Sequence, residues 1–162
     1  MKTYKWILIL LNLLLLLFYF NYSVAQKEAI LKDGQLVLLA LRPVDPRSLM
    51  QGDYMSLRYS ISEKINNEDH PKRGYCVVRL NSKGIAEKVR LQKNRMPLNP
   101  GELLIEYQST DEWNMNIGAE SFFFEEGQAQ KYEKAKFGGL KIDSKGNSVL
   151  IGLYDEALKK IE

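Results

Sequence analysis

The 162-residue chain contains a single cysteine and a single histidine. One cysteine cannot form an intramolecular disulfide, and one histidine cannot supply the clustered ligands of a zinc site. Strand alternation places Cys76 on the same face as Val78 and Leu80, so we expect it to be a buried small hydrophobe. His70 lies in a polar segment with turn residues and is expected in an exposed loop. Packing must therefore stabilise the fold, and we expect neither a metal nor a cofactor.

Charge is missing from residues 6–26, which are strongly apolar. As a helix this segment spans roughly 31 Å, enough to cross a hydrocarbon core of about 30 Å. Trp6, Tyr19 and Tyr22 would then lie near the two membrane interfaces. The small residues at 23–25 also suit the cleavage site of a signal peptide. Residues 1–26 are therefore either a retained transmembrane anchor, which we favour, or a removed signal peptide.

Basic residues orient this segment only weakly, because Lys2 and Lys5 precede it and Lys27 and Lys32 follow it. Its likeness to an export signal favours a cytoplasmic N-terminus. We predict a single-pass protein of the cell membrane, held through residues 6–26, whose domain of residues 27–162 lies on the periplasmic or extracellular side.

The densest basic cluster has no interleaved aromatic residues on which bases could stack. It comprises Lys88, Arg90, Lys93 and Arg95. An exported domain would also rarely meet DNA. We interpret the cluster as a solvated strand edge or turn and predict no nucleic-acid partner.

Short strand-like runs separated by turn residues dominate the rest of the chain. They lie at 35–41, 54–61, 74–80, 85–91, 102–108, 116–124, 139–143 and 147–154. Turns at 81–84 and 144–146 predict two hairpins. Helix formers at 127–139 predict one helix of about two to three turns, and residues 155–162 suit one last helical turn or two. The predicted class is α+β, predominantly antiparallel β with one short helix, preceded by a single N-terminal transmembrane helix.

The stretch GDYMSLRY at 52–59 combines turn residues with a strand pattern. Gly52 permits a backbone conformation that a side chain would hinder, and Asp53 can accept hydrogen bonds from nearby amides in a turn. Period-two alternation then predicts a core face and an outer face. The core face holds Met55, Leu57, Tyr59 and Ile61, and the outer face holds Tyr54, Ser56 and Arg58. Since the two tyrosines lie on opposite faces, we do not expect one two-tyrosine site.

Gly52, Asp53, Tyr54, Leu57 and Tyr59 match the motif of the GDYXXLXY protein family, which this chain resembles. The preceding PVDPRSLMQ and the later ESFFFEEGQAQKYE are also similar to family segments, so the resemblance covers most of 34–153. It implies a small, membrane-anchored bacterial protein without an assigned activity. Multi-span membrane proteins encoded nearby are associated with the family and are candidate partners. The five motif residues are our candidate site, with a structural or a binding role.

A more distant likeness would imply catalysis. Serine–lysine peptidases of the signal-peptidase type carry a nucleophilic serine in a Ser-Met-x-Pro segment ahead of a Gly-Asp turn, and a lysine on a later strand. Here Pro43 occupies the serine position and has no hydroxyl, while Ser48 lies out of register. Lys88 would be the base, but it shares a face with Ala86 and Arg90 that we expect to be solvated. We therefore predict a non-enzymatic binding or accessory module for another membrane protein, and keep a divergent hydrolase as the alternative.

Three consecutive phenylalanines occupy residues 122–124. Alternation places Phe122 and Phe124 on one face, which we expect to be core, because aromatic residues in strands are usually packed. Phe123 points the other way and is the candidate for a surface contact.

Overall fold

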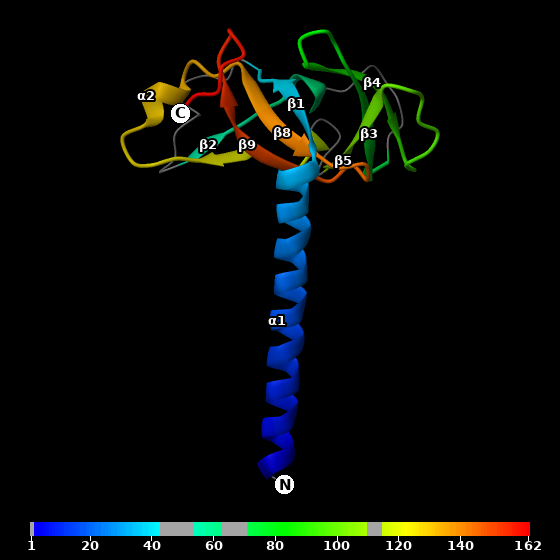
Figure 1. Cartoon of the computed structure of the whole chain (residues 1–162), viewed down its shortest axis with the longest axis vertical. Helices are drawn as coiled ribbons and strands as arrows, with labels where there is room; N and C mark the ends of the chain where they lie inside the picture. The colour runs from blue at the N-terminus through cyan, green and yellow to red at the C-terminus, as the bar shows by residue number, and fades with distance from the viewer. Residues whose placement is uncertain (1, 43–53, 63–70, 110–114) are drawn as a thin grey trace.

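The computed structural model describes residues 2–42, 54–62, 71–109 and 115–162. A long helix, α1 (Lys2–Asp33), projects from a β-rich domain (Figure 1). The strands are β1 (Gln35–Ala40), β2 (Tyr54–Ser56), β3 (Arg73–Leu80), β4 (Ala86–Gln92), β5 (Glu102–Ser109), β6 (Met115–Asn116), β7 (Ser121–Phe123), β8 (Phe137–Ile142) and β9 (Ser148–Tyr154). A short helix, α2 (Ala129–Tyr132), follows β7. The predicted α+β class with mostly antiparallel strands is confirmed.

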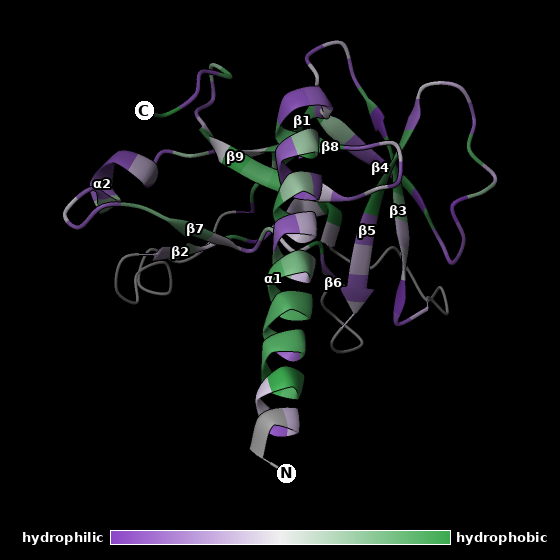
Figure 2. Cartoon of the chain, turned by 60° about the horizontal axis from the view of Figure 1, so that its bottom comes forward, coloured by the Kyte–Doolittle hydropathy of each residue, from purple (hydrophilic) through white to green (hydrophobic). Residues whose placement is uncertain are grey.

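The helix α1 is long and apolar enough to cross a membrane. Its side chains from Tyr4 to Ala29 are all exposed, and hydrophobic residues cover most of its length (Figure 2). The last turn enters the domain, where Ile30 is 6% exposed and the helix contacts β8 and β9. The Lys27 ammonium also donates to the Ser148 carbonyl at 3.4 Å. One continuous helix therefore joins the apolar segment to the packed domain.

The described strands form a three-stranded sheet in the order β1-β8-β9, a four-stranded sheet in the order β4-β3-β5-β6 and a two-stranded ribbon of β2 and β7. The β3-β4 and β8-β9 pairs are the two predicted hairpins. Backbone bonds link the sheets, since the Leu38 amide donates to the Gly84 carbonyl at 3.1 Å and the Glu106 amide to the Gly146 carbonyl at 2.8 Å. The two sheets and the ribbon consequently share one core.

The core draws side chains from all three groups of strands, and its burial supplies most of the favourable free energy of folding. Its members include Val37, Leu39, Met55, Leu57, Tyr59, Ile61, Cys76, Val78, Ile105, Tyr107, Leu140, Ile142 and Leu153. The predicted inner face of residues 54–61 is confirmed, because all four of its side chains are buried. Cys76 is buried as predicted.

Two helical predictions were wrong. The helix expected at 127–139 is only α2, because Phe137, Gly138 and Gly139 pair with β1 and β9 as part of β8. Gly138 also lies against the ring of Tyr59, where a Cβ would come within 2.8 Å of the ring. Residues 155–162 form a turn rather than a helix, since the Ile161 amide donates to the Leu153 carbonyl at 2.8 Å and draws the chain end back onto β9.

Two predicted strands are shorter than expected. The strand at 54–61 ends at Ser56, and a 3₁₀ turn, Ser60–Ser62, follows. The strand at 116–124 is divided into β6 and β7, because the Glu120 carboxylate accepts a hydrogen bond from the Ile117 amide and turns the chain between them. In the first segment the Ser62 amide donates to the Tyr59 carbonyl at 3.0 Å, so in both segments a local hydrogen bond takes the place of strand pairing.

Candidate functional site

The inner residues of the motif lie deep in the domain. Leu57 is 3% exposed and Tyr59 is 1% exposed. The Tyr59 hydroxyl donates to the Ala119 carbonyl at 2.6 Å. Burial, with a smaller contribution from the charge of Glu120, raises the pKa of Tyr59 above its usual range, so the phenol remains a proton donor. These two side chains act as packing and hydrogen-bonding elements of the core.

The backbone of the motif segment connects two other parts of the fold. The Leu57 amide donates to the Glu120 carbonyl at 2.8 Å, next to the β2-β7 ribbon. One residue further on, the Arg58 carbonyl accepts a hydrogen bond from the Arg42 amide at 2.8 Å, beyond the end of β1. Residues 57–59 therefore tie the ribbon to the three-stranded sheet.

Tyr54 lies on the opposite face from Leu57 and Tyr59, as the alternation predicts. It pairs with Phe123 in the β2-β7 register, and their ring centroids are 5.8 Å apart. Phe123 is 74% exposed, which confirms that it points away from the core. Phe122 and Phe124 are half-buried and contact the ring of Tyr132 on α2, with centroid distances of 5.0 and 5.4 Å.

Several predictions concern positions that lie outside the described residues. They are those for Gly52 and Asp53 of the motif, for Pro43 and Ser48, and for His70. Of the five motif residues, the structure thus places Tyr54, Leu57 and Tyr59, and it separates the first from the other two.

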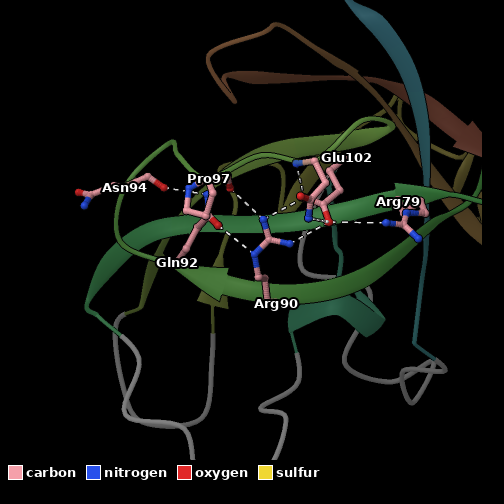
Figure 3. A network of polar contacts seen from close by, with 7 residues as sticks. Arg79, Arg90, Gln92, Asn94, Pro97 and Glu102 are labelled. Carbon is pink, nitrogen blue, oxygen red and sulfur yellow. Dashed lines mark hydrogen bonds and ion pairs between the residues drawn. The ribbon is translucent and has the colours of Figure 1, made fainter.

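One residue of the basic cluster, the half-buried Arg90, forms an ion pair with the buried carboxylate of Glu102 (Figure 3). Arg90 on β4 binds Glu102 on β5 through two contacts of 2.8 Å, and it also donates to the Pro97 carbonyl at 2.9 Å. Asn99 donates to the same carboxylate from its amide at 2.9 Å and its side chain at 3.1 Å. Hydrogen bonds from Arg90 and Asn99 lower the pKa of Glu102 to about 2, against an opposing effect of desolvation. Arg90 therefore has a structural role, because it links β4 to β5 of the four-stranded sheet.

The expectation of a solvated face for Ala86, Lys88 and Arg90 was wrong. Ala86 is buried, Lys88 and Arg90 are half-buried, and the neighbouring Val89 is 42% exposed instead. A register shift between Val77 and Val78 disrupts the pairing of β3 with β4 at this point. The prediction that the cluster occupies a strand edge holds for Lys88 and Arg90, because β4 is the outer strand of its sheet.

Cys76 lies between Leu91 and Ile105 in the sheet register. Burial raises the pKa of its thiol to about 12, although the nearby Lys88 acts in the opposite direction. A thiol with such a pKa is protonated at neutral pH and is a poor nucleophile.

A groove of about 610 Å³ lies where α1 joins the domain. Apolar side chains of Ala29, Ile30, Leu103 and Ile142 line part of it. Polar residues surround them and include Gln26, Lys27, Asp33, Asp143, Lys145 and Asn147. The sequence does not predict this groove, because its walls come from three segments that are far apart in the chain, residues 23–35, 103 and 142–147. The one usable signal is the predicted turn at 144–146.

We call it the juxtamembrane groove, because one of its walls is the apolar helix α1. Hydrogen bonds fix the β8-β9 turn that forms another wall. The Asp143 carboxylate accepts from the Lys145 amide at 2.9 Å, the Asn147 amide at 2.8 Å and the Asn147 side chain at 2.7 Å. Partial burial raises the pKa of Asp143, but these hydrogen bonds outweigh it and the pKa lies below its usual range. Gly146 has a φ of 92° and its carbonyl accepts from β5, so a side chain there would be strained and would approach Leu104.

A family model described as GDYXXLXY protein matches residues 16–153. The chain belongs to this family. The match begins inside α1 and ends at the last residues of β9, so it includes the end of the apolar helix, the motif segment and both large sheets. Searches among curated proteins and among solved structures found no match.

Proposed function

We propose that this GDYXXLXY protein is a membrane-tethered, non-enzymatic binding module that contacts another membrane protein through the juxtamembrane groove. The proposal rests on the shape and composition of this groove. It combines an apolar floor with a charged rim, and one of its walls is the helix that is suited to cross the bilayer. The groove would therefore lie close to the membrane surface, within reach of an extramembrane loop of a multi-span protein in the same membrane.

The groove is suited to a peptide segment for two reasons. Its volume of about 610 Å³ falls within the range of pockets that enclose small ligands or a few side chains. Its rim is preorganised, because the Asp143 turn and the Gly146 contact hold β8 and β9 against β5 before any partner arrives. Binding would therefore cost little ordering of the chain.

Photocrosslinking in native membranes tests this proposal. A photoreactive amino acid replaces Ser144, which is exposed on the groove wall, and the full chain is irradiated in the membranes that produce it. We expect an adduct with a multi-span membrane protein. Ala29→Trp fills the groove and should abolish the adduct, whereas Ala157→Trp, an exposed position in the C-terminal turn, should leave it intact. No adduct, or an adduct that survives Ala29→Trp, would contradict the proposal.

The non-enzymatic part of the proposal is tested separately. Serine-directed covalent probes should not label the purified full chain, and Ser48→Ala and Lys88→Ala should leave the crosslink from residue 144 unchanged. Labelling that disappears in Ser48→Ala would instead support the hydrolase alternative, with Ser48 as nucleophile.

We also propose that the domain lies on the periplasmic or extracellular side. The test is modification of Ala157→Cys by a membrane-impermeant maleimide in cells whose outer barrier has been opened. We expect labelling without lysis; labelling only after lysis would place the domain in the cytoplasm.

A further inference from the structure

The outer face of the β2-β7 ribbon is an uncharged aromatic surface that the core does not use. The rings of Tyr54 and Phe123 contact each other across the two strands with their planes tilted by 41°, and Ser56 pairs with Ser121 two positions along. Tyr54 is half-buried. Ser56 and Ser121 are exposed, as is Phe123 at 74%. The other face of β7 is occupied, because Phe122 packs against Tyr132 of α2.

The ribbon lies on the side of the domain from which α1 emerges. In Figure 1 β7 runs along the lower edge of the domain beside the base of α1, while α2 lies above it. Figure 2, turned to bring the underside forward, also shows β2 and β7 beside α1, on the same side of it as α2. Phe122 and Phe124 face α2, so strand alternation turns Phe123 and its partner Tyr54 to the opposite face of the ribbon, away from α2.

The length of α1 sets the distance between this face and the bilayer. The uncharged segment ends at Gln26 and the helix ends at Asp33, so the helical rise places the base of the domain about 10 Å beyond the uncharged segment. The headgroup layer occupies roughly 5 to 8 Å on each side of the hydrocarbon core. Aromatic rings that point down from the base of the domain therefore reach the headgroup layer.

We propose that Tyr54 and Phe123 form a second membrane contact, in which the two rings enter the lipid headgroup region beside the spanning helix. Tyrosine is enriched at this depth because its ring is amphipathic, and phenylalanine is found on the apolar face of helices that lie in the interface. Together with α1, the contact fixes the rotation of the domain on the membrane and presents the juxtamembrane groove at a constant height. It needs lipid alone and does not depend on the proposed partner.

Spin-label accessibility in vesicles tests this contact with the full chain and no other protein. The probe is a nitroxide on Ser121→Cys in phosphatidylcholine vesicles, which leaves both rings in place. The comparison is the same label on Ala157→Cys, in the turn after β9 that lies on the side of the domain away from α1 (Figure 1). Native Cys76 is buried and should remain unlabelled.

Oxygen partitions into lipid and a nickel chelate stays in water, so the ratio of their collision rates with the label reports its depth. We expect a higher oxygen-to-nickel ratio at residue 121 than at residue 157, and a fall of the 121 ratio toward the 157 value when Phe123→Ser is added. Equal ratios at 121 and 157, or a 121 ratio that Phe123→Ser does not change, would overturn the proposal. If Ser121→Cys does not fold, a label on Ser56→Cys, which is opposite in the register, gives the same comparison.

Discussion

The helix α1 and the motif segment 54–61 are both rich in apolar side chains, but they place them in different surroundings. In α1 the described side chains from Tyr4 to Ala29 are all exposed. In the motif segment every second side chain is buried, and Tyr59 reaches 1% exposure. The unbroken apolar run is thus long and apolar enough to cross a membrane, whereas the side chains of the alternating run are buried by the protein itself.

Because of this difference, α1 and the motif segment should contribute to different properties of the protein. An exposed leucine of α1 contributes nothing to the packing of the domain, although it contributes to the transfer of the helix into a bilayer. A buried leucine of the motif segment contributes to the core and leaves the membrane contact unchanged. Substitutions in the two regions should therefore affect different measurements.

The largest loss of stability is expected for Leu57→Ala. Its side chain is almost fully buried, so truncation should lower the free energy of unfolding by about 2 to 5 kcal/mol through lost burial and a residual cavity. Denaturant unfolding of the full chain in detergent micelles measures the change. The matched control is Leu14→Ala in α1, which is 55% exposed and should leave domain unfolding unchanged. Equal unfolding curves for Leu57→Ala and wild type would show that the motif does not stabilise the core.

A smaller loss is expected for Tyr59→Phe. The ring is retained, but the buried Ala119 carbonyl loses its hydrogen bond from the phenol, which should cost about 1 to 3 kcal/mol in the same unfolding experiment. Tyr54→Phe, on the outer face, should change stability by less than about 0.5 kcal/mol. If the two variants were equally stable, the distinction between inner and outer motif residues would be wrong.

A loss confined to low pH is expected at Glu102, because protonation of its carboxylate removes the ion pair with Arg90. The pKa of Glu102 is about 2 in the folded chain and 4.5 ordinarily, so its charged form stabilises the fold. That stability is complete above about pH 4.5 and declines as the pH falls toward about 2. Unfolding midpoints across this range should decline less steeply for Glu102→Gln than for wild type. Parallel declines would show that the pair with Arg90 does not contribute.

Much of the fold follows from local patterns in the sequence. The uncharged run predicts α1, the period-two alternation predicts the buried face of residues 54–61, and the turns at 81–84 and 144–146 predict the two hairpins. Each of these depends on residues close together in the chain, where spacing and turn chemistry are sufficient. The buried state of Cys76 follows from the same alternation.

The remaining features depend on contacts between distant segments. The predicted helix at 127–139 is shortened because residues 137–139 pair with β1, about 100 residues earlier. The face of β4 was misjudged because neither the register shift near Val77 nor the pairing of Arg90 with Glu102 has a local signal. The juxtamembrane groove was missed for the same reason, since it exists only where α1, β5 and the β8-β9 turn meet.

The most direct test of the membrane-tethered state is the intact mass of the mature chain, extracted by detergent from membranes washed at alkaline pH. One continuous helix that is long and apolar enough to cross a membrane runs into the domain, so we expect the anchor and the domain to remain one chain. We expect a mass that includes residues 1–26, recovered in the washed membranes. A mature chain that begins at Gln26 and is released by the wash would contradict the anchor, and with it the proposed membrane-proximal role of the groove and of the aromatic pair.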